Sequence, residues 1–258
     1  MSFIMTCKQL VLCQELIDII IDHAHDDRDV LLNCSLASRI FLPSTRLYLF
    51  ERLHLQASHW DDFFNLLRLP LATITHVQFI TLNFESRSHP DPLSVITYLH
   101  GLRLYSIALV NMHVRNQNYL DHEFTGFDDL RRLHITHGYF TNPIQMFDII
   151  SKFTGVEHLC LGPLDFTHNI VAPSTNDHPH KSTAHFWKIF EQHDLAAHFE
   201  ILVWLTQQPD LSALQTIALT GLEAQDFDVV GKLLRALGSQ LKYLELQLPG
   251  TRIGMSTC

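Results

Sequence analysis

The chain has 258 residues, of which 47% are hydrophobic, so it contains enough apolar material to form a substantial core. Acidic residues outnumber basic ones by 27 to 18, which gives a formal net charge of −9. A surface of that sign repels phosphate, so we expect neither nucleic acid nor an anionic membrane as a partner. No apolar run approaches the ~18 residues needed to cross a bilayer, and the interrupted N-terminus is unlike a signal peptide.

The cysteines are few, odd in number and far apart, and no two of them form a C-x-x-C pair. They are Cys7, Cys13, Cys34, Cys160 and Cys258. This distribution is typical neither of a disulfide framework nor of a structural zinc site. We therefore expect a reducing compartment, which means a cytoplasmic and/or nuclear location.

Residues 10–55 predict three short helices. The first covers residues 14–25, where four apolar residues fall on one face: Leu16, Ile17, Ile20 and Ile21. Asp26 or Asp27 is placed to cap a second helix, and Pro43 is placed to begin a third. Three short helices bury little apolar surface by themselves, so this unit requires support from the rest of the chain or from a partner.

The same region contains residues that match two halves of a known motif, L-P-x-E-L-x-x-x-I followed by C-x-L-x-C/S-R-x-F/W. The first half is matched by Leu12, Glu15, Leu16 and Ile20, and the second by Cys34, Leu36, Ser38, Arg39 and Phe41. Residues 10–55 therefore resemble an F-box, in the form found in fungal F-box-like proteins. One position departs from the motif, because Cys13 stands where the family has proline.

F-box proteins are the substrate-selecting subunits of Skp–cullin–F-box ubiquitin ligases. The resemblance implies that residues 10–55 dock onto the Skp adaptor and thereby join the cullin core. The residues that it makes candidates for the adaptor contact are Leu12, Glu15, Leu16, Ile17, Ile20, Leu36, Arg39 and Phe41. In the family the missing proline belongs to the surface that grips the adaptor, so Cys13 predicts weaker adaptor binding.

Residues 56–258 contain an internal repeat of the form L-x-x-L-x-L. Its six copies are Val77/Ile80/Leu82, Leu104/Ile107/Leu109, Leu130/Leu133/Ile135, Val156/Leu159/Leu161, Leu214/Ile217/Leu219 and Leu241/Leu244/Leu246. From residues 77, 104, 130, 156, 214 and 241, the intervals are 27, 26, 26, 58 and 27. The short intervals fall within the ~20–29 residues typical of leucine-rich repeats.

This spacing predicts an α/β fold, in which the N-terminal helices are followed by a leucine-rich-repeat-like solenoid with a parallel, curved sheet. The strands should lie side by side in chain order. The helices predicted between them cover residues 60–69, 92–100, 143–153 and 224–237. The alternative is an ordinary α/β sheet whose spacing is coincidental.

Two parts of the solenoid depart from the repeat. The 58-residue interval predicts a degenerate repeat or an insertion, with a long loop over residues 167–183 and a helical stretch over residues 186–206. After Leu246 the chain ends in TRIGMSTC, which offers no capping helix. We expect either an exposed sheet edge or a truncated C-terminus there.

The third and fifth positions of each strand should face away from the core, because side chains alternate along a strand. On two neighbouring strands these positions hold Arg132, His134 and His158, and on the last strand they hold Tyr243 and Glu245. Since repeat proteins commonly bind partners on this face, the five residues are candidates for binding a protein client. The alternative is a face that is only solvated or covered by the chain itself.

Catalytic and metal-binding patterns are weak throughout the sequence. The histidines of the long loop, His178, His180 and His185, lack further ligands, and His23 and His25 fit a polar helix–helix turn. The sequence has neither a G-x-S-x-G motif nor a phosphate-binding loop. We expect no enzyme, no cofactor and no metal, but a substrate-recognition subunit of a ubiquitin ligase. The alternative is a repeat scaffold that no longer engages a ligase.

Overall fold

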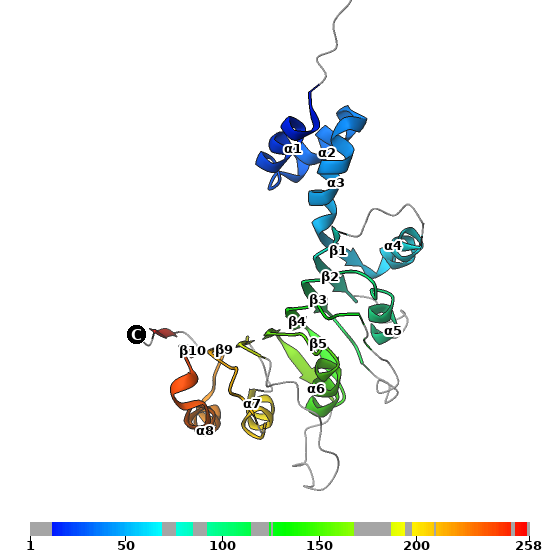
Figure 1. Cartoon of the computed structure of the whole chain (residues 1–258). Coiled ribbons are helices and arrows are strands. Elements are labelled where there is room, and N and C mark those ends of the chain that lie inside the picture. The colour runs from blue at the N-terminus through cyan, green and yellow to red at the C-terminus, as the bar shows by residue number, and fades with distance from the viewer. Residues whose placement is uncertain are drawn as a thin grey trace, which may run out of the picture. The chain divides into compact units, whose positions relative to one another are not determined.

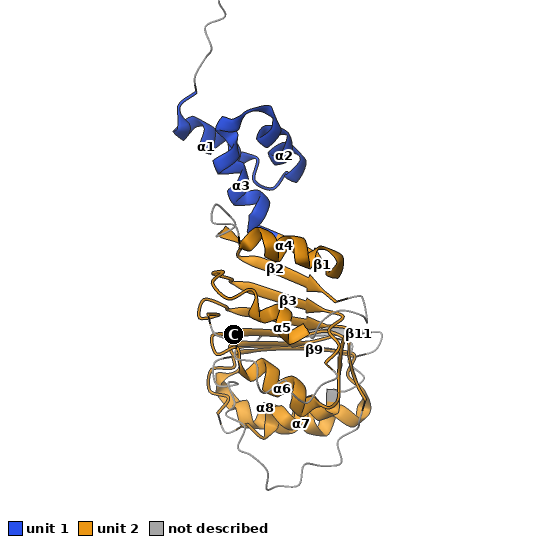
Figure 2. Cartoon of the chain, turned by 90° about the vertical axis from the view of Figure 1, so that its right-hand side faces the viewer, with its two compact units in different colours: residues 1–52 blue, residues 53–258 orange. Residues whose placement is uncertain are grey.

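The computed structural model of the chain describes residues 12–68, 76–84, 92–114, 124, 126–167, 187–193, 198–208, 210–248 and, by their backbone, 251–256. The chain divides into two units, which we call the N-terminal unit (residues 1–52) and the sheet unit (residues 53–258). Figure 2 shows them in different colours. Each unit has a hydrophobic core of its own.

The N-terminal unit consists of three α-helices and a short 3₁₀ turn. They are α1 (Gln14–His23), α2 (Arg28–Ala37), η1 (Arg39–Phe41) and α3 (Leu42–Glu51). The Asp27 carboxylate accepts hydrogen bonds from the backbone N–H groups of Asp29 and Val30, so the cap of α2 is Asp27. Pro43 lies in the first turn of α3, as predicted. Proline is tolerated there because the backbone N–H groups of a first turn have no hydrogen-bond acceptor within the helix.

The core of the N-terminal unit is small. Its buried apolar residues are Ile17, Ile21, Leu31 and Leu49. Three side-chain hydrogen bonds join α1 to α3 beside this core, because Ser44 donates to Asp18, Tyr48 donates to Asp22 and Gln14 donates to Ser44. The three helices are therefore held by few apolar contacts and by a small number of polar ones.

The sheet unit is built on one large sheet. Its strands are β1 (Arg52–Gln56), β2 (Phe79–Asn83), β3 (Ser106–Val110), β4 (Arg132–Thr136), β6 (His158–Leu161), β8 (Ile189–Gln192), β9 (Thr216–Thr220), β10 (Tyr243–Leu248) and β11 (Thr251–Ser256). The first eight are parallel and lie in chain order, whereas β11 runs antiparallel to β10 (Figure 1). The predicted α/β class and the chain order of the six predicted parallel strands are confirmed. The sheet extends beyond these strands, however, to β1 at one end and β11 at the other, and β8 separates β6 from β9, which were expected to be neighbours.

Helices join successive strands of this sheet. They are α4 (Trp60–Leu67, preceded by η2, Ala57–His59), α5 (Pro92–Thr97), α6 (Pro143–Ser151), α7 (His198–Thr206) and α8 (Phe227–Leu237, between η6, Ala224–Asp226, and η7, Gly238–Gln240). Figure 1 shows α4 to α8 on one side of the sheet. A small second sheet pairs β5 (Gly138–Phe140) with β7 (Leu164–Phe166). Helix α8 ends at Gly238, whose φ of 55° favours glycine.

The core of the sheet unit is formed by the repeat positions. In the repeat copies that contain β2, β3, β4, β6 and β9, the residues at the fourth and sixth positions of L-x-x-L-x-L are at most 2% exposed. They are Ile80, Leu82, Ile107, Leu109, Leu133, Ile135, Leu159, Leu161, Ile217 and Leu219. Because strands are in register, these side chains stack in two rows along the sheet. Hydrophobic burial along these rows is the main stabilising term of the unit.

The region of the 58-residue interval differs from the prediction. The helix expected over residues 186–206 is wrong in its first part, because residues 189–192 form β8 between β6 and β9. Only α7 is helical in this range. The strand is a seventh copy of the repeat, Trp187/Phe190/Gln192, which begins 214 − 187 = 27 residues before Leu214. This copy was not recognised in the sequence, because its sixth position is the polar residue Gln192, where the other copies have Leu or Ile.

Gln192 is an exception in an otherwise apolar row. It is 0% exposed, and within the described part of the chain its Oε1 and Nε2 atoms have no hydrogen-bond partner. A buried amide without partners loses its bonds to water and gains nothing in return. The other end of the sheet also differs from expectation, because β11 pairs along the edge of β10 that was expected to be exposed.

Candidate functional site

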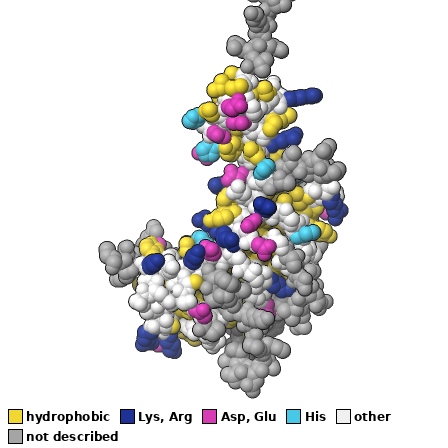
Figure 3. Space-filling model, viewed as in Figure 1, with side chains coloured by type: hydrophobic (Ala, Val, Ile, Leu, Met, Phe, Trp, Pro, Cys, Tyr) yellow, Lys and Arg dark blue, Asp and Glu magenta, His cyan; other side chains and the backbone are white. Residues whose placement is uncertain are grey.

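Two surfaces of the chain carry the residues singled out in the sequence. The first is on the N-terminal unit, where nine large apolar side chains are exposed: Leu12, Leu16, Ile19, Ile20, Val30, Leu32, Leu36, Ile40 and Leu47. We call eight of these side chains, all except Val30, the apolar surface. Figure 3 shows hydrophobic side chains at the surface of these helices. Contiguous exposed apolar area in a soluble protein commonly marks a site of protein interaction.

Helix α1 divides its apolar residues between core and surface. Ile17 is fully buried, whereas Leu16 and Ile20 are 48% and 47% exposed. Successive residues of a helix are turned by about 100°, so Leu16, Ile19 and Ile20 form a stripe beside the buried one. Burial leaves Ile17 no surface for a partner, and we therefore assign it to the core rather than to the adaptor contact.

Helix α2 adds a second part of the apolar surface. Leu32 and Leu36 lie one turn apart on the same side of the helix, and Leu36 is 83% exposed. Val30 is turned away from both by more than 100°. The other candidates in this unit lie as follows: Arg39 is exposed, whereas Phe41 is half-buried and packs against the core.

The residue at the family's proline position begins α1. Cys13 is the N-cap of the helix, with φ −71° and ψ 155°, and its side chain makes no capping hydrogen bond. A φ of this value is close to the one that proline requires. Hydrogen bonds from the Glu15 backbone and then from the Cys13 side chain lower the pKa of Glu15, so this exposed carboxylate is ionised near neutral pH.

The second surface is the open face of the sheet, opposite the core. The register makes Arg132 the partner of His158, and it places His134, Cys160 and Glu191 in one row across β4, β6 and β8. Arg132 and His134 are exposed, as their positions predicted. The guanidinium of Arg132 lies 5.6 Å from the centre of the Tyr105 ring.

Glu191 lies at the centre of the polar residues on this face. The His158 Nε2 atom is 3.4 Å from one of its carboxylate oxygens, and the His193 Nε2 atom is 3.8 Å from the other. The close approach of the polar His158 ring is the main reason that the pKa of Glu191 is lowered, and the charge of His193 adds to it. Glu191 is therefore an anion flanked by two imidazoles, which are attracted to it most strongly when protonated.

Cys160 and His134 lie beside Glu191 in less hydrated surroundings. Burial, followed by the charge of Glu191, raises the pKa of the Cys160 thiol to about 12. Burial, followed by the neighbouring His193, lowers the pKa of His134. A thiol with so high a pKa is a poor nucleophile at neutral pH, because the thiolate is the reactive form.

The remaining client candidates lie apart from this cluster. Tyr243 donates a hydrogen bond of 3.0 Å to Glu245 on β10, and β9 separates this pair from β8. In the row of Glu191 and Glu245, the residue between them is Ala218. The five candidates thus face the same side of the sheet but form two groups.

Sequence reasoning missed Glu191 and His193, because β8 was not recognised as a strand. The 27-residue interval before Leu214 was the signal that could have found them. Within the described residues, the one group that combines three metal-ligand side chains is Cys160, Glu191 and His193. The histidines of the long loop, His178, His180 and His185, lie outside the described residues.

No family model matches this chain, and no curated protein matches it. Among the described residues, no helix is both long enough and apolar enough to span a membrane. The functional argument therefore rests on the two surfaces themselves.

Proposed function

We propose that the chain is the substrate-recognition subunit of a Skp–cullin–F-box ubiquitin ligase. In this proposal the N-terminal unit binds the Skp adaptor, and the open face of a leucine-rich-repeat-like solenoid binds a protein client. The observation that carries the proposal is the apolar surface of the N-terminal unit. Such a role places the chain in the cytoplasm and/or the nucleus.

The apolar surface supports an adaptor contact because it coincides with the residues of the F-box resemblance. Leu12, Leu16, Ile20 and Leu36 match the motif, and each is at least 40% exposed. Exposed side chains of this size are unfavourable in water unless a partner covers them. Arg39, which also matches the motif, is exposed and is available for polar contacts.

The sheet supports the client half of the proposal through its regularity. The strands repeat at a near-constant interval, and their open face combines cationic, imidazole and carboxylate groups. Arg132, His134 and His158 form one group, and Tyr243 and Glu245 form the other. Mixed groups of this kind give electrostatic specificity rather than large affinity, which suits the selection of one client among many.

Titration of the full chain with purified Skp adaptor tests the adaptor half. The parent chain should bind, and Ile20→Glu and Leu36→Asp should each weaken binding by about 30-fold, since a central apolar contact contributes ~2 kcal/mol or more. Both positions are exposed, so circular dichroism and the melting curve should be unchanged. Val30→Asp is the matched control, because it places the same charge elsewhere on α2 and should leave the affinity unchanged.

A second candidate function is a repeat scaffold that no longer engages a ligase. The observation that favours it is Cys13 at the motif's proline position. If neither the parent chain nor Cys13→Pro binds the adaptor, the ligase proposal fails and the scaffold remains. Binding that is equally weakened by Val30→Asp and Leu36→Asp would also contradict the assigned contact.

A further inference from the structure

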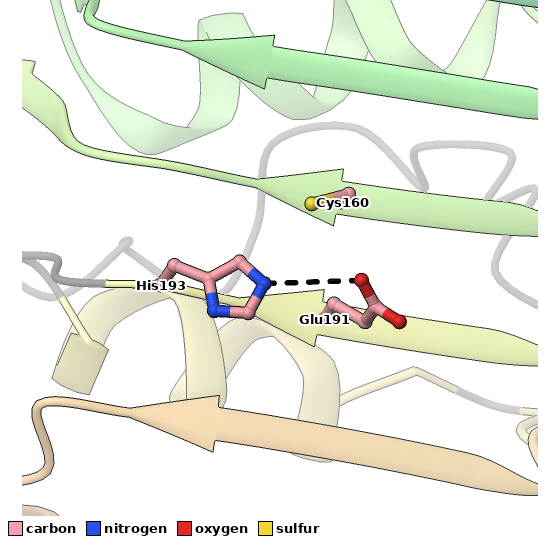
Figure 4. Close-up of side chains that lie close together, drawn as sticks. All are labelled: Cys160, Glu191 and His193. Carbon is pink, nitrogen blue, oxygen red and sulfur yellow. Dashed lines mark ion pairs between the residues drawn. The ribbon is translucent and has the colours of Figure 1, made fainter. Parts of the chain in front are cut away.

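Three side chains on the open face of β6 and β8 carry different metal-ligand atoms. The sulfur of Cys160, a carboxylate oxygen of Glu191 and a ring nitrogen of His193 all lie within 4.8 Å of one another. Figure 4 shows Cys160 on one strand and the other two residues on the next. We propose that these three residues bind a divalent transition-metal ion of the zinc class, with water as the fourth ligand.

Backbone pairing holds the three residues together. Cys160 and Glu191 are direct partners in the register of β6 and β8. The backbone N–H of His193 donates a 2.8 Å hydrogen bond to the Leu161 carbonyl, which continues the ladder beyond Gln192. Because side chains two residues apart lie on the same side of a strand, Glu191 and His193 both face the side of Cys160.

Little movement is needed to close the site around an ion. Zinc-class ions are bound at 2.0–2.3 Å from sulfur, nitrogen and oxygen, so tetrahedral ligand atoms lie about 3.5 Å apart. The separations here, up to 4.8 Å, must therefore shrink by roughly 1 Å. The side chains of Glu191 and His193 are 32% and 40% exposed, so both have room to rotate.

The donor set selects the class of ion. A thiol and an imidazole favour zinc-like ions, whereas Mg²⁺ and Ca²⁺ prefer sites made of oxygen alone. Cysteine binds such an ion as its thiolate, so binding at Cys160 would release the thiol proton to solvent.

His158 adds a separate observation that fits an ion at this position. Its two ring nitrogens are buried and make no hydrogen bond within the described residues, although Nε2 lies 3.4 Å from Glu191. A small rotation of Glu191 toward an ion lets His158 donate to that carboxylate. Groups that hydrogen-bond to a metal ligand commonly fix its orientation.

Cobalt absorption in the full chain tests the proposal. The chain has 18 histidines, so metal binding alone is not diagnostic, whereas a thiolate-to-cobalt charge-transfer band reports a cysteine ligand. The test protein is untagged, and Ser replaces its four other cysteines, Cys7, Cys13, Cys34 and Cys258. Titration with Co²⁺ should give this band at one equivalent, and Zn²⁺ but not Mg²⁺ should remove it.

Variants of the ligands complete the test. Cys160→Ser should abolish the band, and His193→Ala and Glu191→Gln should weaken binding at least ~10-fold. Glu191→His should keep the band, because it replaces one ligand by another, and His100→Ala, a matched exposed histidine, should change nothing. No band in the chain that retains Cys160 alone, or an unchanged affinity in His193→Ala, would overturn the proposal. The experiment uses no partner protein, so its result is independent of the proposed ligase function.

Discussion

The two units use their apolar residues in opposite ways. Among the described residues, the N-terminal unit buries four apolar side chains and exposes nine large ones, whereas the sheet unit buries 48 and exposes seven. A unit of 52 residues encloses little volume, so its apolar residues cannot all be covered by its own chain. The sheet unit adds a strand with each repeat and buries it against the last. Large apolar residues thus lie mainly at the surface of the first unit, where we propose that a partner binds, and mainly in the core of the second.

Substitution of leucine in each unit should give the largest contrast. Leu133→Ala removes a side chain that is 1% exposed and leaves a cavity, so the free energy of unfolding should fall by ~2–5 kcal/mol. Leu36→Ala removes an 83% exposed side chain and should change it by at most ~0.5 kcal/mol. Denaturant titration measures both, and equal losses would contradict the assignment of the two residues to core and surface.

Gln192→Leu sharpens the comparison within the sheet unit. The parent amide is fully buried and has no hydrogen-bond partner among the residues that the structure describes, and the same position in β6 and β9 holds Leu161 and Leu219. Replacing it by a side chain of similar size removes two unpaired polar atoms and should stabilise the chain by ~1–3 kcal/mol.

Gln247→Leu is the control for Gln192→Leu. Gln247 is the fifth residue of β10 and is only half-buried, so Gln247→Leu should increase the free energy of unfolding much less than Gln192→Leu does. A loss of stability in Gln192→Leu would mean that the Gln192 amide has a compensating interaction.

The order of the parallel strands could be predicted from the sequence, because the spacing of L-x-x-L-x-L is itself a consequence of stacking. The strand β8 could not be predicted by that pattern, since Gln192 breaks it at the position where the others have Leu or Ile. Glu191 and His193 were therefore not predicted as site residues, because both depend on recognising β8 as a strand. Side chains from β6 and β8 meet only through the register, which no local pattern contains.

The apolar surface could be predicted only in part. Helical periodicity correctly placed Leu16, Ile17, Ile20 and Ile21 near one another. It could not separate Ile17 from Leu16, because burial depends on where α3 packs and not on the period of α1. Periodicity therefore identified two residues of the surface and two residues of the core as a single group.

Cys13→Pro tests the N-terminal unit with a smaller expected effect. The φ of −71° at Cys13 fits proline, whose rigidity lowers the entropy of the unfolded chain. The free energy of unfolding of the N-terminal unit should rise by ~0.4–1 kcal/mol, as measured by hydrogen exchange of the α1 amides. In the adaptor titration the same variant should bind more tightly than the parent. Cys13→Ala controls for loss of the thiol and should give neither gain.

Acid should weaken the attachment of α1 to α3 in the N-terminal unit, and this is the smallest effect. Hydrogen bonds from Ser44 and then from Gln14 lower the pKa of Asp18 below its ordinary 3.8. A lowered pKa in the folded state means that the ionised group stabilises the fold above pH 3.8. This contribution is lost as the pH falls from 3.8 through the folded value.

Asp18 joins α1 to α3 through Ser44, so hydrogen exchange in α1, corrected for the intrinsic pH dependence of amide exchange, should accelerate over this range while the corrected exchange in β3 and β4 stays constant. Asp18→Asn carries no titrating carboxyl and should remove the acceleration, although it should also be less stable near neutral pH because the charge is gone. An α1 whose exchange follows that of the sheet at every pH would mean that the two units unfold together, and that the small core of the N-terminal unit does not set its stability.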